Sequence, residues 1–392
     1  MRVSRTLLVA AVAFAVLAGS AQGSARPRSA PVVEGQYIVV LRDGARAQAG
    51  DLEQRHGFRA RLRFGRALKG FAARLSARQV ERLESDPAVE TVTPDRRVHA
   101  LGSLVAGDSV PTGVQRIGAA GDGAARDAAS VNVAVIDTGI DLANADLHAA
   151  NGRNCVQPGT AAQDDHGHGT HVAGSIAARN DGAGVVGVAP GTKLYAAKVL
   201  DASGAGTESQ VICGIDWVAS TRTDADPTND VAVANMSLGG AGPPVGSCAS
   251  TSDPEHLAIC RATGLGVTFV VAAGNSGWNF DYAPQPDLPA AYPEVLTVTA
   301  MSDSDGRAGG TGGSSPCDAG EADDAFATFS NFATSAASQA HTIAGPGTCI
   351  ESTALGGGTA LMSGTSMATP HVAGAVALCL GEAGAEGPCA GQ

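Results

Sequence analysis

The amino-acid sequence predicts an α/β fold preceded by a smaller α+β unit. Nearly 300 residues follow residue 100, enough to build one large core. Within them, strand-like segments that are apolar almost throughout alternate with helical stretches rich in Ala and Gly, as in a parallel sheet covered on both faces. The predicted strands are residues 131–137, 193–200, 231–238, 267–274 and 295–300.

The first residues predict a secretory signal peptide at 1–23. Arg2 and Arg5 precede the apolar run 7–19, and small residues follow that run. No later apolar run approaches the roughly twenty residues that a membrane helix needs. We therefore expect a secreted chain with no membrane contact after the signal is removed.

The cysteines fit the same compartment. All eight lie after residue 150, and disulfides form in oxidising surroundings. The sequence leaves their pairing open, although Cys248 with Cys260 and Cys317 with Cys349 are close enough along the chain for local bridges. Cys317 belongs to residues 301–325, a stretch rich in Gly, Ser and Asp that predicts a long surface insertion.

Residues 32–100 form the predicted α+β unit, which differs from the rest in charge. Seventeen Lys and Arg against nine Asp and Glu give residues 1–100 a net charge of +8, whereas nine against 29 give residues 101–392 a net charge of −20. Opposite charges favour docking of the two parts. The acidic part argues against a nucleic-acid partner, and the basic unit lacks an aromatic base-stacking motif. Its pattern is a ferredoxin-like βαββαβ unit, with strands at 35–43, 58–64, 68–75 and 89–100 and helices at 45–57 and 76–88.

The segment 363–374, SGTSMATPHVAG, places Ser366 at the start of an apolar helix. Free N–H groups and the positive end of the helix dipole favour negative charge beside this serine, as acyl transfer requires. Pro370 lies near the helix start, where a missing N–H costs little. Ser366 is therefore a candidate nucleophile.

Two further motifs supply its partners. VNVAVIDTG (131–139) predicts a buried strand that ends at Asp137, and DDHGHGTHVAG (164–174) places His168 before a small-residue helix. A histidine held by a carboxylate can take the proton of a serine hydroxyl. The spacing of His166, His168 and His171 also permits a second hypothesis, a zinc hydrolase. That hypothesis is weaker, because such sites usually have an Asp before the third His and this chain has Thr170.

The four motifs VIDTGID, HGHGTHVAG, AAGNS and GTSMATPHVAG, in this order, resemble the subtilisin-like serine proteases. The resemblance implies a three-layer, doubly wound, mostly parallel sheet. It makes Ser366 the nucleophile, His168 the general base and then acid, and Asp137 the group that orients the imidazole. Asn275 would complete the oxyanion hole.

The resemblance also implies where a substrate binds. Ser237, Leu238 and Gly239 would pair with an extended peptide by strand addition. The walls of the primary specificity pocket would be Ala272, Ala273 and Gly274. Asp287 would lie near the floor of that pocket, where its carboxylate would attract Lys or Arg. We expect broad cleavage after large apolar residues, with basic residues also accepted.

By the same resemblance, residues 32–100 are an inhibitory propeptide and residues 108–392 the peptidase domain. Maturation is expected between Leu101 and Asp108, with Leu101 before the scissile bond as the first choice. A structural calcium ion is expected as well, because hard oxygen ligands occur at the matching positions. The expected ligands are the side chains of Asp108, Asp146 and Asp181 and the carbonyl groups of Arg179, Ala183 and Val185.

The sequence thus predicts a secreted, monomeric serine endopeptidase, made as a zymogen that processes itself and needing no cofactor for catalysis. Its partners would be protein or peptide substrates and its own propeptide. A non-catalytic secreted binding protein of the same fold is the alternative, and a zinc metallohydrolase is a more distant one.

Overall fold

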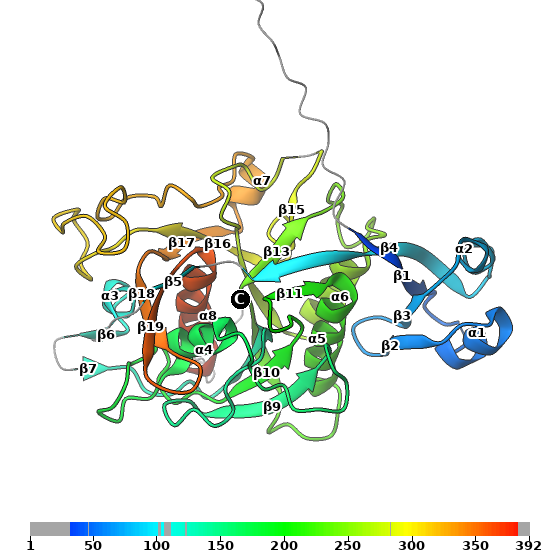
Figure 1. Cartoon of the computed structure of the whole chain (residues 1–392), viewed down its shortest axis with the longest axis horizontal. Coiled ribbons are helices and arrows are strands. Elements are labelled where there is room, and N and C mark those ends of the chain that lie inside the picture. The colour runs from blue at the N-terminus through cyan, green and yellow to red at the C-terminus, as the bar shows by residue number, and fades with distance from the viewer. Residues whose placement is uncertain are drawn as a thin grey trace, which may run out of the picture.

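The computed structural model describes residues 32–45, 47–100, 103–105, 111–121, 124–282 and 284–382. An N-terminal unit (residues 32–100) lies at one end of the molecule, against a larger C-terminal unit (residues 103–382) (Figure 1). The predicted signal peptide, residues 1–23, lies outside the described residues. Among the helices of the described part, none combines the length and apolar character that crossing a membrane would require.

The N-terminal unit has the predicted βαββαβ order. Its four strands form an antiparallel sheet in the order β4-β1-β3-β2. The two helices bury Leu52 and Leu83 against Val39 and Phe71 of the sheet, which closes a small core of its own. The elements are β1 (Val32–Leu41), α1 (Ala49–His56), β2 (Ala60–Phe64), β3 (Gly70–Arg74), α2 (Ala77–Glu84) and β4 (Val89–Ala100).

The C-terminal unit is built on a seven-stranded parallel sheet in the order β17-β16-β14-β12-β8-β10-β9. The strand order reverses next to β8, which makes the sheet doubly wound, as predicted. Ligands of such sheets bind beside the carboxyl ends of the strands at the reversal. The strands are β8 (Asn132–Asp137), β9 (Ala149–Asn154), β10 (Leu194–Lys198), β12 (Val231–Met236), β14 (Thr268–Ala272), β16 (Leu296–Met301) and β17 (Thr342–Pro346).

Helices cover both faces of this sheet. Val133 and Val135 of β8 belong to the same cluster as α4 (His168–Ala177) and α8 (Thr365–Glu382), whereas Ala134 and Ile136 pack with α5 (Glu208–Thr221) and α6 (Pro254–Gly264). Successive residues of a strand point to opposite faces, so an unbroken apolar run can serve two cores at once. This is the three-layer arrangement that the sequence predicts.

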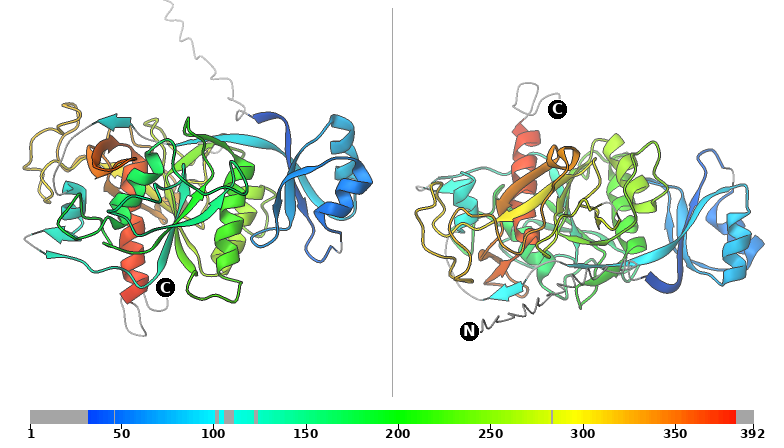
Figure 2. Two further views of the ribbon diagram at one scale, coloured as in Figure 1. Left: turned by 60° about the horizontal axis from the view of Figure 1, so that its bottom comes forward. Right: turned by 90° about the horizontal axis from the view of Figure 1, so that it is seen from above.

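Strand β4 joins the two units. It leaves the N-terminal sheet and continues between β11 (Ala205–Thr207) and β13 (Leu238–Ala241), pairing antiparallel with both (Figures 1 and 2). The sheet of the N-terminal unit thereby extends to the C-terminal unit. The remaining elements are β5 (Ser103–Val105), α3 (Thr112–Arg116), β6 (Ala120–Gly121), β7 (Ala124–Ala125), β15 (Asp287–Leu288), α7 (Ala336–Gln339), β18 (Ile350–Thr353) and β19 (Thr359–Ser363).

Three disulfides join pairs of described residues in the C-terminal unit. The two local bridges considered from the sequence are present, Cys248–Cys260 and Cys317–Cys349. A third bridge, Cys155–Cys213, ties the segment after β9 to α5. Cys317 anchors the Gly-rich segment after β16, which has no helix or strand between residues 302 and 325. Such bridges restrict the unfolded chain, and secreted proteins commonly use them.

Candidate active site

Asp137 and His168 meet at the carboxyl end of β8. Asp137 is the last residue of that strand and His168 the first residue of α4. Nδ1 of His168 lies 2.8 Å from Oδ1 and 3.0 Å from Oδ2 of Asp137. Both side chains are buried, so the carboxylate fixes the orientation of the imidazole and leaves Nε2 for another partner.

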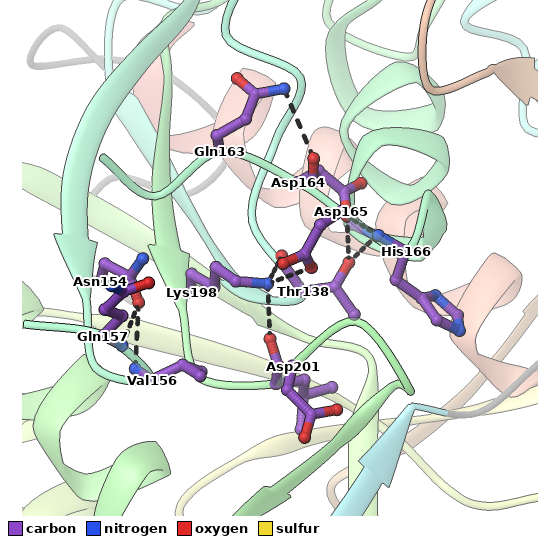
Figure 3. Close-up of polar contacts among 12 residues, drawn as sticks. Thr138, Asn154, Val156, Gln157, Gln163, Asp164, Asp165, His166, Lys198 and Asp201 are labelled. Carbon is purple, nitrogen blue, oxygen red and sulfur yellow. Dashed lines mark hydrogen bonds and ion pairs between the residues drawn. The ribbon is translucent and has the colours of Figure 1, made fainter. Parts of the chain in front are cut away.

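Asp164 holds the start of α4 in place. Its Oδ2 accepts hydrogen bonds from the backbone N–H of Thr170 (3.0 Å) and from the hydroxyl of Thr170 (2.5 Å). Its Oδ1 accepts the hydroxyl of Thr138 at 2.9 Å, and Thr138 Oγ1 in turn accepts the N–H of Gly169 at 2.9 Å (Figure 3). A side chain at Gly169 would collide with the carbonyl oxygen of Gly139. These contacts therefore fix the start of α4 against the segment that follows β8.

A buried lysine also holds the segment that follows β8. Nζ of Lys198 donates to the carbonyl oxygens of Thr138 (2.7 Å) and Leu200 (2.8 Å), and it pairs with Asp165 Oδ1 at 2.6 Å (Figure 3). The lysine side chain is only 4 % exposed. Sequence reasoning missed Asp164, Asp165 and Lys198. Their signal is weak, because an Asp pair before a His motif and one Lys in an apolar strand have no local pattern that reveals their partners.

Ser366 is the second residue of α8, and its side chain is fully buried. Its Oγ donates to the carbonyl oxygen of Ser237 at 3.2 Å, and the Oγ of Ser237 donates to the carbonyl oxygen of Ser366 at 2.8 Å. Ser237 lies between β12 and β13, and β12 neighbours β8 in the sheet. Ser366 is thus hydrogen-bonded to the residue that follows β12, and Asp137 ends the adjacent strand β8.

Asn275 is fixed by the residue before the serine. Its Oδ1 accepts the backbone N–H of Thr365 at 2.8 Å and the hydroxyl of Thr365 at 2.9 Å. The hydroxyl of Thr365 also accepts the N–H of Gly274 at 3.1 Å. An amide held by its oxygen presents its NH₂ group on the other side. Asn275 therefore has a defined donor direction beside the start of α8.

His166, His168 and His171 do not form a cluster of metal ligands. His166 is exposed, and its ring centre lies 6.3 Å from that of His168. His171 is buried, with Nε2 3.0 Å from the carbonyl oxygens of Ile350 and Ala360, and burial lowers the pKa of His171 to about 3. The groups of possible metal ligands among the described residues include none of these histidines. The zinc hypothesis therefore has no support.

The predicted substrate strand is already paired with a segment of the chain. Gly239 pairs with His99 and Leu238 with Ala100, while Gly206 on the other side pairs with Val98. Ser237 lies one residue before this paired segment, and its hydroxyl donates to the carbonyl oxygen of Ser366. The last residues of β4 thus lie where an extended peptide is expected.

The chain resumes beside the serine helix. Leu101 and residue 102 lie outside the described part, but Ser103 begins β5 and pairs with Ser363, three residues before Ser366. Ala100 and Ser103, the described residues on either side of 101–102, thus pair with Leu238 and Ser363, which belong to two segments near Ser366. These two pairs are the bracket around residues 101–102.

The predicted pocket residues line one small cavity of about 150 Å³. Asp287 contributes to it, and its Oδ2 accepts hydrogen bonds from Trp278 Nε1 and Asn331 Nδ2, each at 2.6 Å. Burial raises the pKa of Asp287, and these two donors oppose the rise. The carboxylate is thus held at the pocket rather than in open solvent. The other lining residues that were predicted are Gly239, Ala272, Ala273 and Gly274.

The predicted calcium residues lie in one loop region, except Asp108, which lies outside the described residues. Oδ1 of Asp146 accepts the N–H of Arg179 at 3.1 Å, and Oδ2 accepts the N–H of Val185 at 3.2 Å. Burial and then the charge of Asp181 raise the pKa of Asp146. Asp181 and Ala183, the other predicted ligands, belong to the same loop as Arg179 and Val185.

The comparisons with known proteins agree with this geometry. Residues 128–386 match the subtilase family, and residues 36–101 match peptidase inhibitor I9. Subtilisin E of Bacillus subtilis (strain 168) is 35 % identical over 379 residues, covering 95 % of this chain and 86 % of the relative. The subtilisin of Bacillus pumilus is 39 % identical over 274 residues, covering 69 % of this chain and 85 % of the relative.

A solved structure shares the architecture. The crystal structure of a cold-adapted subtilisin-like serine proteinase matches with a TM-score of 0.53 and 32 % identity, covering 70 % of this chain and 86 % of that chain. Together with the parallel sheet and the matched inhibitor unit, these relatives place the chain in a known group. The chain belongs to the subtilase family of serine endopeptidases.

Proposed function

We propose that this protein is a secreted, monomeric endopeptidase that cuts its own chain beside Ser366 and is then inhibited by its N-terminal unit. In the proposed triad, Ser366 is the nucleophile, His168 the general base and acid, and Asp137 the group that orients His168. The support is the 2.8 Å contact between His168 and Asp137, and the position of Ser366 at the start of α8.

The proposed reaction follows from these positions. Ser366 Oγ attacks the scissile carbonyl carbon while its proton passes to Nε2 of His168, and Asp137 stabilises the imidazolium. The oxyanion accepts hydrogen bonds from the N–H of Ser366 and the amide of Asn275. When the C–N bond breaks, His168 returns the proton to the leaving amine. Water then attacks the Ser366 ester, with His168 again as the base, and releases the acid.

One observation carries the proposal of self-processing, namely the bracket around residues 101–102. An extended strand that ends at Ala100 enters between β11 and β13, and the chain leaves along β19 at Ser103. A peptide bond after Leu101 would therefore lie between the two segments that border Ser366. After cleavage, β4 would remain as a bound product strand.

The interface explains how the N-terminal unit would inhibit. Besides the strand pairs, Asp216 of α5 accepts N–H groups from Gly65 (3.1 Å), Arg66 (2.6 Å) and Ala67 (2.8 Å). Leu62, Phe64 and Leu68 join the same apolar cluster as α5. Because buried contacts dominate, we expect salt to weaken the complex only modestly.

We also propose a structural calcium ion at Asp146, Asp181 and the carbonyl groups of Arg179, Ala183 and Val185, with Asp108 as a further ligand. Calcium would neutralise the two carboxylates and close the loop after α4. None of these ligands takes part in the proton transfers proposed above, so the ion would act on stability.

The test is to express the full chain and its Ser366→Ala variant. The wild type should lose residues up to Leu101, label with a fluorophosphonate at Ser366 and hydrolyse casein. The variant should remain uncleaved and unlabelled. An N-terminus well before residue 95 or well after 115 would contradict the processing site. A folded wild type that neither labels nor cleaves would favour a binding protein without catalysis.

A further inference from the structure

Arg96 of β4 is buried in a pocket of acids that belong to the C-terminal unit. Its Nε donates to Glu208 Oε2 at 2.6 Å, and its Nη2 donates to Glu208 Oε1 at 2.9 Å and to Asp253 Oδ2 at 2.6 Å. The arginine side chain is 11 % exposed and that of Glu208 is 2 % exposed. This two-point fork is the geometry in which a guanidinium recognises a carboxylate best.

A third carboxylate, that of Glu255, lies near these two acids. Glu255 is 2 % exposed, and its Oε1 has no hydrogen-bond partner in the described part of the chain. Burial and then the neighbouring Glu208 raise the pKa of Glu255, and Arg96 is the cation that opposes this rise. Arg96 leaves with the N-terminal unit, so the processed enzyme loses this cation and keeps the three acids.

The carboxylate of Asp253 is held in place by the C-terminal unit itself. Asp253 caps α6 by accepting the N–H of His256 at 2.9 Å, and its Oδ1 also accepts the hydroxyl of Tyr292 at 2.8 Å. Glu208 is the first residue of α5, directly after β11. Asp253 therefore keeps two hydrogen bonds without Arg96, whereas the Glu208 carboxylate, which is bonded to Arg96 within the described part of the chain, would become open to another cation.

The register of β4 gives the distance from this pocket to the bond that is cut. Arg97 pairs with Thr207, Val98 with Gly206 and His99 with Gly239. If Leu101 is the first residue before the scissile bond, Arg96 is the sixth. A substrate bound in the same register would present its sixth residue to Glu208 and Asp253.

The space around Arg96 is not filled. A cavity of about 650 Å³ is lined by Arg96, Glu208 and Asp253 together with Pro94, Pro243 and Val245. A substrate side chain of similar length could therefore take the place of the Arg96 side chain without any repacking of the core. The apolar part of the lining suits the methylene groups of Arg or Lys.

From this geometry we propose that the processed enzyme has an acidic subsite, formed by Glu208 and Asp253 with Glu255 nearby, that binds an Arg or Lys side chain at the sixth position before the scissile bond. The inference rests on the proposed function, because it assigns a substrate preference to that activity. Arg should be preferred to Lys, because only Arg can form the two-point contact with Glu208. Substrates with a basic residue in this position would be cut fastest.

The test uses the processed enzyme and peptides with Leu before the scissile bond and Arg, citrulline, Lys or Glu at the sixth position. Citrulline has the shape of arginine without its charge. We expect kcat/KM for the Arg peptide to exceed that for citrulline by about tenfold or more, since hydrogen bonds to a charged group are stronger than neutral ones. Glu208→Gln combined with Asp253→Asn should reduce the ratio below about threefold. The matched control, the exposed Asp226→Asn, should keep it.

The outcomes separate the two proposals. Cleavage of the citrulline peptide reports the endopeptidase activity itself, so cleavage of none of the peptides would contradict the proposed function. Equal kcat/KM for the Arg, citrulline and Glu peptides in the wild type would overturn the subsite, whatever the variants do. If the double variant fails to mature, Glu255→Gln and the wild-type peptide series still decide the question.

Discussion

Ser237 donates a hydrogen bond from its hydroxyl to the carbonyl oxygen of Ser366, over 2.8 Å. In a regular helix that carbonyl would accept the N–H of the residue four positions later. That residue is Pro370, which lies inside α8 and has no N–H. Pro370 is the sixth residue of the helix, further in than the sequence suggested, so its missing donor is replaced by a side chain from the neighbouring strand. The start of α8 is thereby tied to the predicted substrate strand.

This relationship predicts the effect of Ser237→Ala. The change leaves the buried carbonyl of Ser366 without a donor and removes the acceptor of Asn235 Nδ2, so unfolding should become easier by about 1–3 kcal/mol. Pro370→Ala restores an N–H at the right place. Urea unfolding of the inactive Ser366→Ala chain should show a smaller cost of Ser237→Ala in the Pro370→Ala background. Equal costs in both backgrounds would mean that the hydroxyl does not replace the missing N–H.

Asp287 predicts a charge-dependent specificity. Its Oδ2 is occupied by Trp278 and Asn331, so Asp287→Asn can keep both hydrogen bonds through its amide oxygen while losing the charge. Cleavage after Lys and Arg should fall about tenfold, and cleavage after Leu, Phe and Tyr should change little. A peptide-library profile measures both. Unchanged acceptance of Lys and Arg would remove Asp287 from recognition, and absence of cleavage after Leu, Phe or Tyr would overturn the expected breadth.

Calcium removal should lower stability while leaving activity at low temperature. An ion that binds only the folded chain stabilises it by about 2.7 kcal/mol when its concentration is a hundred times its Kd. EGTA should therefore lower the Tm of the Ser366→Ala chain, and Asp181→Asn should reduce that shift. Asp226→Asn is the matched control. An unchanged Tm in EGTA, together with no calcium by elemental analysis, would count against the site.

Asp303 predicts a pH dependence of stability. It is 3 % exposed, burial and then Asp323 raise its pKa to about 6, and its Oδ2 has no partner in the described part of the chain. The folded state binds the proton of the Asp303 carboxyl group more tightly than the unfolded state does. The free energy of unfolding should therefore fall as the pH rises from about 4 through 6. Asp303→Asn should stabilise the chain by roughly 1–3 kcal/mol at pH 8 and hardly at pH 4.

Denaturant unfolding of the Ser366→Ala chain at the two pH values measures this difference. The exposed Asp318→Asn in the same segment is the control. A gain that is equal at pH 4 and pH 8 would show that the charge of Asp303 is not its cause.

Much of the fold could be predicted from the sequence because its signals are local. The predicted last strand of the N-terminal unit, 89–100, has the bounds of β4, and the apolar run before Asp137 forms β8. The helix expected at 45–57 is shorter, Ala49–His56, because Gln48 is extended and caps its start, and Gly57 adopts a left-handed conformation that ends it. The segment 231–238 divides, because the strand turns at Ser237 to reach Ser366.

What the sequence could not reveal depends on partners that lie far apart along the chain. Arg96 reads as one of many arginines in a basic unit, yet Glu208 and Asp253, which bind it, are more than 110 residues away. The opposite charges of the two units were predicted, but not that one arginine would be buried between them. Lys198 is a similar case, since its role at Thr138 follows only from the neighbouring strand. Such contacts are set by packing rather than by pattern.

The double membership of β4 has a consequence for timing. The strand that would remain after the cut is hydrogen-bonded to β1 at one end and to β11 and β13 at the other. A short product peptide would dissociate quickly, but β4 is part of a folded unit that has its own core. The delay between the first cut and free activity should therefore depend on the rate at which the N-terminal unit unfolds or is digested. Destabilising mutations in the core of the N-terminal unit, such as at Leu52 or Phe71, should shorten this delay without changing any group of the active site.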